Sequence, residues 1–174
     1  MGKAALLTIA DLNALDDDAA ARALLRCCGS SRWASAMAAA RPFGSEEAMR
    51  AQADAVWRSL DRADWLEAFA AHPTIGAGGP DPSPWSDEEQ AGVAGAEDGA
   101  LRRLAEGNHD YQTRFGYIFI VCATGKTAAE MLALLEGRLR HDAGGELPVA
   151  ADEQRKITQL RLTKLLEQEP DTIS

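Results

Sequence analysis

The sequence predicts a single all-α domain, a compact bundle of about eight or nine helices, and three observations support this fold class. Ala and Leu dominate, whereas β-branched residues are sparse outside one segment. Apolar positions recur mostly at helical spacing. The 174 residues are enough for one hydrophobic core, and with 46% hydrophobic and 26% charged residues the composition is that of a globular protein.

The first helices can be placed from their capping residues. Thr8–Asp11 resembles the cap of a short first helix, and Asp16–Asp18 puts negative charge at the start of a second, which we expect to end at Gly29. A third helix is expected from Arg32 to Ala40, because Pro42 disfavours helical backbone in the residue before it.

Two further helices are expected at 45–60 and 61–71. Ser45 is the expected cap of the first, whose apolar stripe contains Met49, Ala53, Val56, Trp57 and Leu60. Residues 74–84 then contain three glycines and three prolines, a composition typical of a loop.

In the second half of the chain we expect four helices. One begins at Ser86, and the others span 97–113, 127–140 and 152–168. The helix at 127–140 is expected to end before Gly144 and Gly145. The apolar run Tyr117–Ala123 is too short to classify by its period, so both a strand-like and a buried helical conformation stay open.

Composition excludes several classes of function. A net charge of −9 disfavours nucleic-acid and membrane-surface binding. Three cysteines, two of them adjacent, form neither a disulfide framework nor a metal-ligand spacing, and Met1–Ala10 does not have the pattern of a signal peptide. We therefore expect a cytoplasmic protein without a metal.

A Gly-Lys-Thr sequence at 125–127 is not a nucleotide-binding loop, because Ile120 stands where that motif needs glycine. We expect a turn at Gly125, a helix cap at Thr127 and a solvated Lys126.

His72 is the leading candidate for chemistry. It follows a helix and precedes a proline and a glycine-bearing loop, and imidazole suits proton transfer near neutral pH. Taken alone, a histidine in this position more often stabilises a helix C-terminus by its positive charge, so the surrounding residues must decide between the two roles. His109 and His141 lie in polar surroundings, and we expect both at the surface.

Two other groups of residues fit the binding of a small anion. Ser86, Glu89 and Gln90 can share the N-terminal face of one helix, although Ser86 and Glu89 also match a structural capping box. Arg161 falls near the middle of an apolar arc on the last predicted helix, so it should point inward. A buried guanidinium needs an anionic partner, and either Glu89 or a substrate carboxylate would serve; a structural ion pair is the alternative.

Several blocks together resemble the 2-oxo-4-hydroxy-4-carboxy-5-ureidoimidazoline (OHCU) decarboxylase family. In sequence order they are Arg41-Pro42-Phe43, His72-Pro73-x-Ile75-Gly76, Ser86-x-x-Glu89-Gln90, Asn108-x-x-Tyr111-x-x-Arg114-Phe115-Gly116, Phe119–Ala123 and Lys156-Ile157-x-x-Leu160-Arg161-Leu162. Thr74, where many relatives have a charged residue, and Tyr117-Ile118, in place of a common Phe-Pro, depart from the pattern beside the chemical positions.

The resemblance implies a cofactor-free carboxy-lyase that makes (S)-allantoin in urate breakdown and forms an all-helical homodimer. It implies that His72 is catalytic, and we expect Glu89 to orient it. The substrate-binding residues that it implies are Pro73, Ser86, Asp87, Glu88, Glu89, Gln90, Phe119, Ile120, Val121, Cys122, Ala123 and Arg161. Two alternatives stay open: a lyase that acts on a related ureide, and a non-catalytic helical interaction module.

Overall fold

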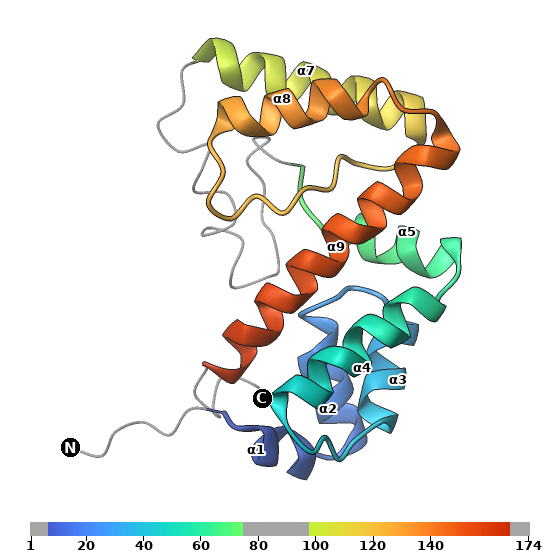
Figure 1. The fold of residues 1–174 in the computed structure, drawn as a ribbon, viewed down its shortest axis with the longest axis vertical. Helices are drawn as coiled ribbons and strands as arrows, with labels where there is room; N and C mark the ends of the chain where they lie inside the picture. Colours follow the sequence, from blue (N-terminus) through green and yellow to red (C-terminus); the bar gives the residue numbers. More distant parts are fainter. Residues whose placement is uncertain (1–6, 75–97, 168–174) are drawn as a thin grey trace, which may run out of the picture. The chain divides into compact units, whose positions relative to one another are not determined.

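In a computed structural model, residues 7–74 and 98–167 are described, and they contain eight helices and no strand (Figure 1). The all-α prediction is confirmed. Contacts divide the chain into two compact units, unit 1 with residues 1–68 and 155–174 and unit 2 with residues 69–154. The expectation of one domain stays a prediction. No helix within the two described ranges is long and apolar enough to cross a membrane.

The capping predictions in the first half are confirmed. The helices are α1 (Ile9–Ala14), α2 (Asp17–Leu25), α3 (Ser31–Ala39), α4 (Glu46–Ser59) and α5 (Arg62–Ala70). Thr8, Asp16 and Ser45 each accept a hydrogen bond from an amide of the first turn that follows them. Helix α2 ends at Leu25, earlier than the predicted Gly29.

Unit 1 is built around the apolar face of α4. The predicted stripe residues Met49, Ala53, Val56 and Trp57 are buried. Trp33 of α3 is fully buried, and its indole N–H donates to the carbonyl oxygen of Ala53 at 3.1 Å. Such a hydrogen bond lets tryptophan fill an apolar core without leaving its polar nitrogen unsatisfied.

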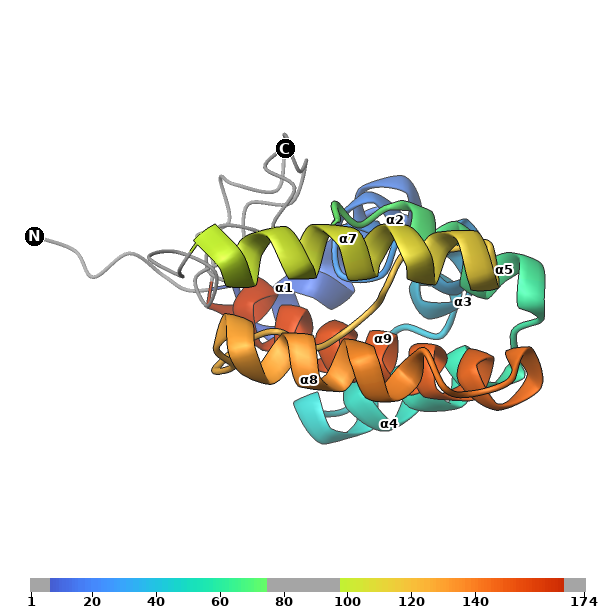
Figure 2. The ribbon, with the colours of Figure 1, turned by 90° about the horizontal axis from the view of Figure 1, so that it is seen from above.

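Unit 2 contains α7 (Asp98–Phe115), α8 (Ala128–Arg138) and the first half of α9 (Ala143–Leu166). Helices α7 and α8 lie side by side and run in the same direction (Figures 1 and 2). They approach closely at Gly107, where an added Cβ would lie 2.5 Å from Cδ2 of Leu135. Only glycine fits this position without displacing the facing leucine.

The parallel course of α7 and α8 explains the conformation of residues 116–127, which connect them. The connection must travel back along α7, which is about 27 Å long, and as a helix its residues would span only about 18 Å. Extended backbone reaches about twice as far. Residues 118–123 accordingly form neither helix nor strand, and Gly116 and Gly125, with φ of 85° and 79°, turn the chain at either side. The predicted turn at Gly125 is thus confirmed.

The prediction for the last helix was wrong at its start. Helix α9 begins at Ala143 and includes Gly144 and Gly145, which the sequence pattern had marked as the end of the preceding helix. Asp142 accounts for the difference, because its carboxylate accepts from the Gly145 amide at 2.6 Å and its carbonyl accepts from the Glu146 amide. A cap of this kind compensates for glycines in the first turn.

Candidate functional site

His72 lies two residues beyond α5, where the sequence placed it. Its amide donates to the carbonyl oxygen of Phe69 at 3.2 Å, so the backbone there is a tight turn. The ring is half-buried, and Nε2 lies 2.6 Å from Oε1 of Gln154, a fully buried residue of α9. Both residues belong to unit 2. The imidazole is therefore held by a tertiary hydrogen bond, which a histidine that only interacts with a helix end does not need.

The segment Phe119–Ala123 is buried throughout, and its backbone is held at two residues. Arg138 donates to the carbonyl oxygen of Ile120. The Cys122 amide donates to Glu153 at 3.0 Å, and the Cys122 carbonyl accepts from Nζ of Lys126 at 2.6 Å. Lys126 thus anchors the segment, and the prediction of a solvated lysine was wrong, because its side chain folds back over its own turn.

Arg138 is the centre of a buried polar cluster with Tyr111 and Glu146. All three are buried, Glu146 completely. The guanidinium donates to Oε1 of Glu146 at 2.6 Å, Tyr111 donates to the same oxygen at 2.5 Å, and the guanidinium carbon lies 4.6 Å from the centre of the Phe119 ring. The carboxylate compensates for the buried cation, which then fixes the Ile120 carbonyl. Burial, followed by the hydrogen bond to Glu146, raises the pKa of Tyr111, so the phenol stays a donor.

The other two histidines lie at the surface, as expected. His141 nevertheless has a structural contact that the sequence did not indicate, because its Nδ1 lies 2.8 Å from Oε2 of Glu146. The same carboxylate therefore bonds Arg138 through one oxygen and His141 through the other.

Arg161 is buried, with 6% of its surface exposed, which confirms that it points inward. It belongs to unit 1, where its guanidinium donates to the carbonyl oxygen of Arg26 at 3.3 Å. Burial raises the pKa of the Cys27 and Cys28 thiols to about 12, with Arg161 opposing the increase in both. A contact of Arg161 with substrate stays a prediction.

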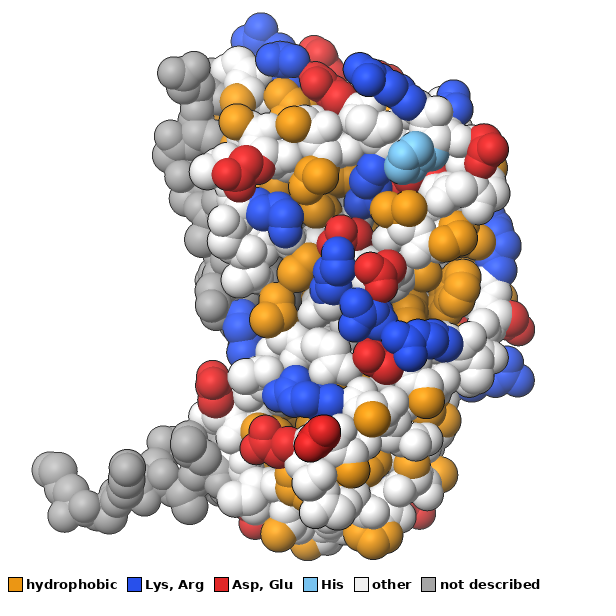
Figure 3. Space-filling view, in the orientation of Figure 1, with side chains coloured by type: hydrophobic (Ala, Val, Ile, Leu, Met, Phe, Trp, Pro, Cys, Tyr) orange, Lys and Arg blue, Asp and Glu red, His pale blue; other side chains and the backbone are white. Residues whose placement is uncertain are grey.

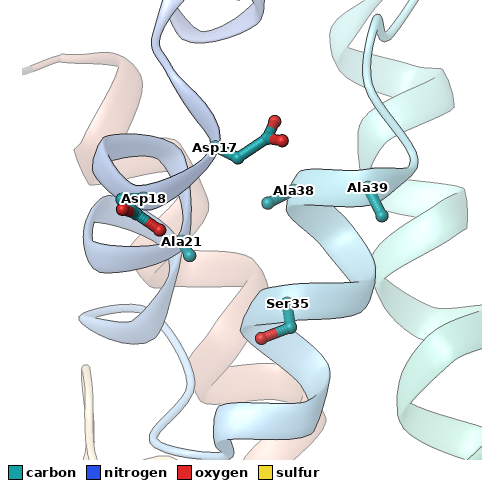
Figure 4. A pocket seen from close by; sticks show the side chains of 6 residues that line it. All are labelled: Asp17, Asp18, Ala21, Ser35, Ala38 and Ala39. Atoms are coloured by element: carbon teal, nitrogen blue, oxygen red, sulfur yellow. The ribbon is translucent and has the colours of Figure 1, made fainter.

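The predicted residues Ser86, Asp87, Glu88, Glu89 and Gln90 lie outside the described residues. The structure also contains a hollow of about 170 Å³ between α2 and α3 (Figure 4). It is lined by Asp17, Asp18, Ala21, Ser35, Ala38 and Ala39. None of these is a predicted site residue, and the two carboxylates would repel an anionic substrate. Among the described residues, no three His, Cys, Asp or Glu side chains are grouped to hold a metal ion.

Sequence reasoning missed Gln154 and the roles of Arg138 and Glu146. The helical period could have indicated that Gln154 and Arg138 lie on buried faces of their helices. Gln154 stands seven residues before Arg161, two turns away on one stripe of the helix, and Arg138 follows the buried Leu135 by three. No local pattern indicated that Glu146 would be buried beside Arg138, because that pairing depends on how two helices meet.

Comparison with known proteins decides the family. The OHCU decarboxylase family model matches residues 13–163, most of the chain. The chain belongs to the OHCU decarboxylase family. The uric acid degradation bifunctional protein TTL of Arabidopsis thaliana is 43% identical over 85% of this chain. The chain spans about half of that protein (48%), but 95% of the OHCU decarboxylase of Haloferax volcanii, which is 29% identical over 91% of this chain.

Solved structures of the family agree. A crystal structure of OHCU decarboxylase in the presence of (S)-allantoin aligns with 84% of this chain and 99% of its own, with a TM-score of 0.75 and 41% sequence identity. A crystal structure of (S)-allantoin synthase, 22% identical, covers 92% of this chain and 54% of its own with a TM-score of 0.72, which shows a shared fold. The helical arrangement is therefore that of the family.

Proposed function

We propose that this chain is a carboxy-lyase that decarboxylates OHCU to (S)-allantoin during urate breakdown, without a cofactor. The observation that carries the proposal is its likeness, in fold and sequence, to the OHCU decarboxylase crystallised with (S)-allantoin. The half-buried His72, with its ring held against α9, supplies the proton-transfer group that the reaction needs.

The chemistry of the substrate accounts for a reaction without a cofactor. The bond between C4 and the carboxylate breaks, and CO2 leaves. Its electron pair forms a C4–C5 double bond, while the π electrons of the adjacent C=N bond move to nitrogen, which takes up a proton. The 4-hydroxyl then loses its proton to become a carbonyl, and C5 gains a proton on one face. The substrate thus contains its own electron acceptor.

His72 is the residue we assign to proton transfer. Two steps can use it, removal of the hydroxyl proton and delivery of a proton to C5. The hydroxyl-bearing C4 and C5 are adjacent atoms of one small molecule, so a single imidazole can reach either proton. Glu89 would orient the ring or balance its charge.

The remaining predicted residues bind and orient the substrate in this proposal. Arg161 holds an anionic or carbonyl edge, while Ser86 and Gln90 contact ureido or ring groups. In the segment Phe119–Ala123, the carbonyls of Ile120, Cys122 and Ala123 and the Cys122 amide already have intramolecular partners. We therefore assign recognition to the other backbone groups of the segment. Pro73, Asp87 and Glu88 are further substrate-binding residues in this proposal.

The test compares wild type with His72→Ala on freshly generated OHCU, with circular dichroism following (S)-allantoin. We expect the enzyme-dependent rate to fall by at least about a hundredfold, the lower range for loss of a general acid or base. His109→Ala is the matched control, because it removes an exposed histidine of the same unit. Equal rates for wild type and His72→Ala would remove His72 from the mechanism. A wild type no faster than buffer would favour the interaction module instead.

We also propose that the chain works as a homodimer, one domain per protomer, in the cytoplasm. The three cysteines, all among the described residues, are buried and form no disulfide, as in proteins of a reducing compartment. Size-exclusion chromatography with light scattering checks the assembly, with about twice the 18.6 kDa chain mass expected. A mass equal to that of one chain at assay concentration would contradict the dimer.

A further inference from the structure

Arg138 contacts two consecutive residues of the segment Phe119–Ala123, which the proposed function assigns to substrate recognition. One guanidinium N–H donates to the carbonyl oxygen of Ile120, and the guanidinium carbon lies 4.6 Å from the centre of the Phe119 ring. Arg138 is in the last turn of α8, 18 residues beyond Ile120, and all of these residues belong to unit 2. The guanidinium is therefore a tertiary support for the backbone of the segment.

This support has a fixed direction, because the guanidinium uses different donors for its two partners. Nε and Nη2 each lie 2.6 Å from Oε1 of the fully buried Glu146, while Nη1 donates to the Ile120 carbonyl. Tyr111 donates to the same carboxylate oxygen. A planar group that is bonded along one edge cannot turn without breaking those hydrogen bonds, so Nη1 stays directed at the carbonyl.

A bond to one carbonyl orients a whole peptide group. The peptide bond is planar and trans, so its N–H points opposite to its C=O. The bond from Arg138 to the Ile120 carbonyl therefore also sets the direction of the Val121 N–H, one of the backbone groups assigned to recognition. Residues 118–123 are in neither helix nor strand, so a side chain has to fix this peptide where a helix or a sheet ladder would do so elsewhere.

We propose that Arg138 is a positioning residue for substrate binding, which holds the Ile120–Val121 peptide in the orientation that recognises substrate and so sets affinity through the backbone. The inference rests on the proposed function, which assigns the segment to recognition. Glu146 has a different task. Its side-chain hydrogen bonds go to Arg138, Tyr111 and His141, so it balances the buried cation and contributes to stability.

The experiment separates positioning from stability by comparing Glu146→Gln with the double variant Arg138→Met Glu146→Gln. Urea unfolding, kinetics with OHCU and calorimetry with (S)-allantoin are measured on each. Glu146→Gln leaves the guanidinium on the Ile120 carbonyl, so it should lose stability but keep KM and the Kd of (S)-allantoin within about twofold. The double variant removes the carbonyl's partner together with the uncompensated charge. It should regain part of the stability, while KM and Kd rise about tenfold and kcat stays within about threefold.

Arg103→Met Glu136→Gln is the matched control, because it removes the exposed ion pair between α7 and α8. It should leave stability, KM and Kd unchanged. Arg138→Lys is a second test that keeps a positive charge beside Glu146. A compact ammonium cannot bond Glu146 on one side and the Ile120 carbonyl on the other as a guanidinium does. KM and Kd should therefore rise by a similar factor in a protein that is more stable than Glu146→Gln.

Two results would overturn the inference. One is an active wild type whose two Arg138 variants keep its KM and Kd. The other is a Glu146→Gln protein whose KM and Kd rise as far as those of the double variant, because binding would then follow stability. A wild type that does not convert OHCU would instead overturn the proposed function. Calorimetry with (S)-allantoin would then still decide whether Arg138 sets affinity, and a wild type that binds no (S)-allantoin either would overturn both.

Discussion

His72 and Ile120 lie in the same unit, but the structure holds them by different means. The His72 ring is bonded to a neutral amide, Gln154. The Ile120 carbonyl is bonded to a guanidinium whose charge is balanced by the fully buried Glu146. The group proposed for proton transfer has a neutral partner, whereas the backbone proposed for recognition has a charged one.

The difference between a neutral and a charged partner matches the two proposed tasks, proton transfer by His72 and substrate recognition by the backbone at Ile120. A buried ion pair loses much free energy if one member is removed, so it suits a part that must not move. A neutral amide leaves the imidazole able to gain and lose a proton, as catalysis requires. Figure 3 shows that elsewhere charges of both signs mix on the displayed surface, where solvent weakens their interactions. Changes at Glu146 should therefore affect stability, and changes at His72 activity.

The largest expected effect on stability is that of Glu146→Gln. The substitution keeps the shape of the side chain but leaves the buried Arg138 without a compensating charge. Breaking a buried pair in this way costs about 3 to 5 kcal/mol of unfolding free energy. Urea unfolding followed by far-ultraviolet circular dichroism measures it.

Glu136→Gln is the matched control, since Glu136 pairs with Arg103 at 2.9 Å on the exposed face of the same helix pair. It should leave the urea midpoint almost unchanged. If both variants lost the same stability, the contrast between buried and exposed pairs would be wrong for this protein.

A smaller effect on stability is expected from pH, because two buried thiols stay neutral in the folded protein at a pH where they ionise in the unfolded chain. The Cys27 and Cys28 thiols have their pKa raised from 9.0 to about 12, so the folded protein binds more protons than the unfolded chain. Their contribution is complete below pH 9, decreases as the pH rises and is lost by about pH 12. Between about pH 8 and 10 each thiol should cost about 1.4 kcal/mol.

Comparison of wild type with the Cys27→Ala Cys28→Ala protein isolates this effect, because lysines and tyrosines ionise in both. Over the same pH interval wild type should lose more unfolding free energy than the variant, by roughly twice the value for one thiol. Parallel pH profiles would show that the two thiols ionise as readily in the folded protein as in the unfolded chain.

The sequence predicted features that depend on neighbours along the chain. Thr8, Asp16 and Ser45 cap helices because a hydroxyl or carboxylate beside the first turn is sufficient. His72 could be placed after a helix, and Arg161 inside one, from the same local periodicity. Both are properties of a single element.

Features that depend on packing between elements were missed. The partner of His72 is 82 residues away, and Glu146 is buried only because Arg138 on another helix lies beside it. The extended course of residues 118–123 follows from the parallel arrangement of α7 and α8, which no local pattern reveals. The early start of α9 shows the same limit, since Gly144 and Gly145 predict the end of a helix whereas Asp142 caps the start of one.

The smallest expected effect tests whether burial of the acid decides the strength of these arginine pairs. Arg41, like Arg138, is nearly covered, and it pairs with Asp17 at 2.8 Å, but the Asp17 side chain is 91% exposed. Arg41 also donates to the carbonyl oxygens of Leu12 and Leu15. Asp17→Asn should therefore leave the urea midpoint unchanged within error, because solvent and these carbonyls continue to satisfy the cation. A loss as large as that of Glu146→Gln would mean that the acid matters to a buried arginine even when it is itself in water.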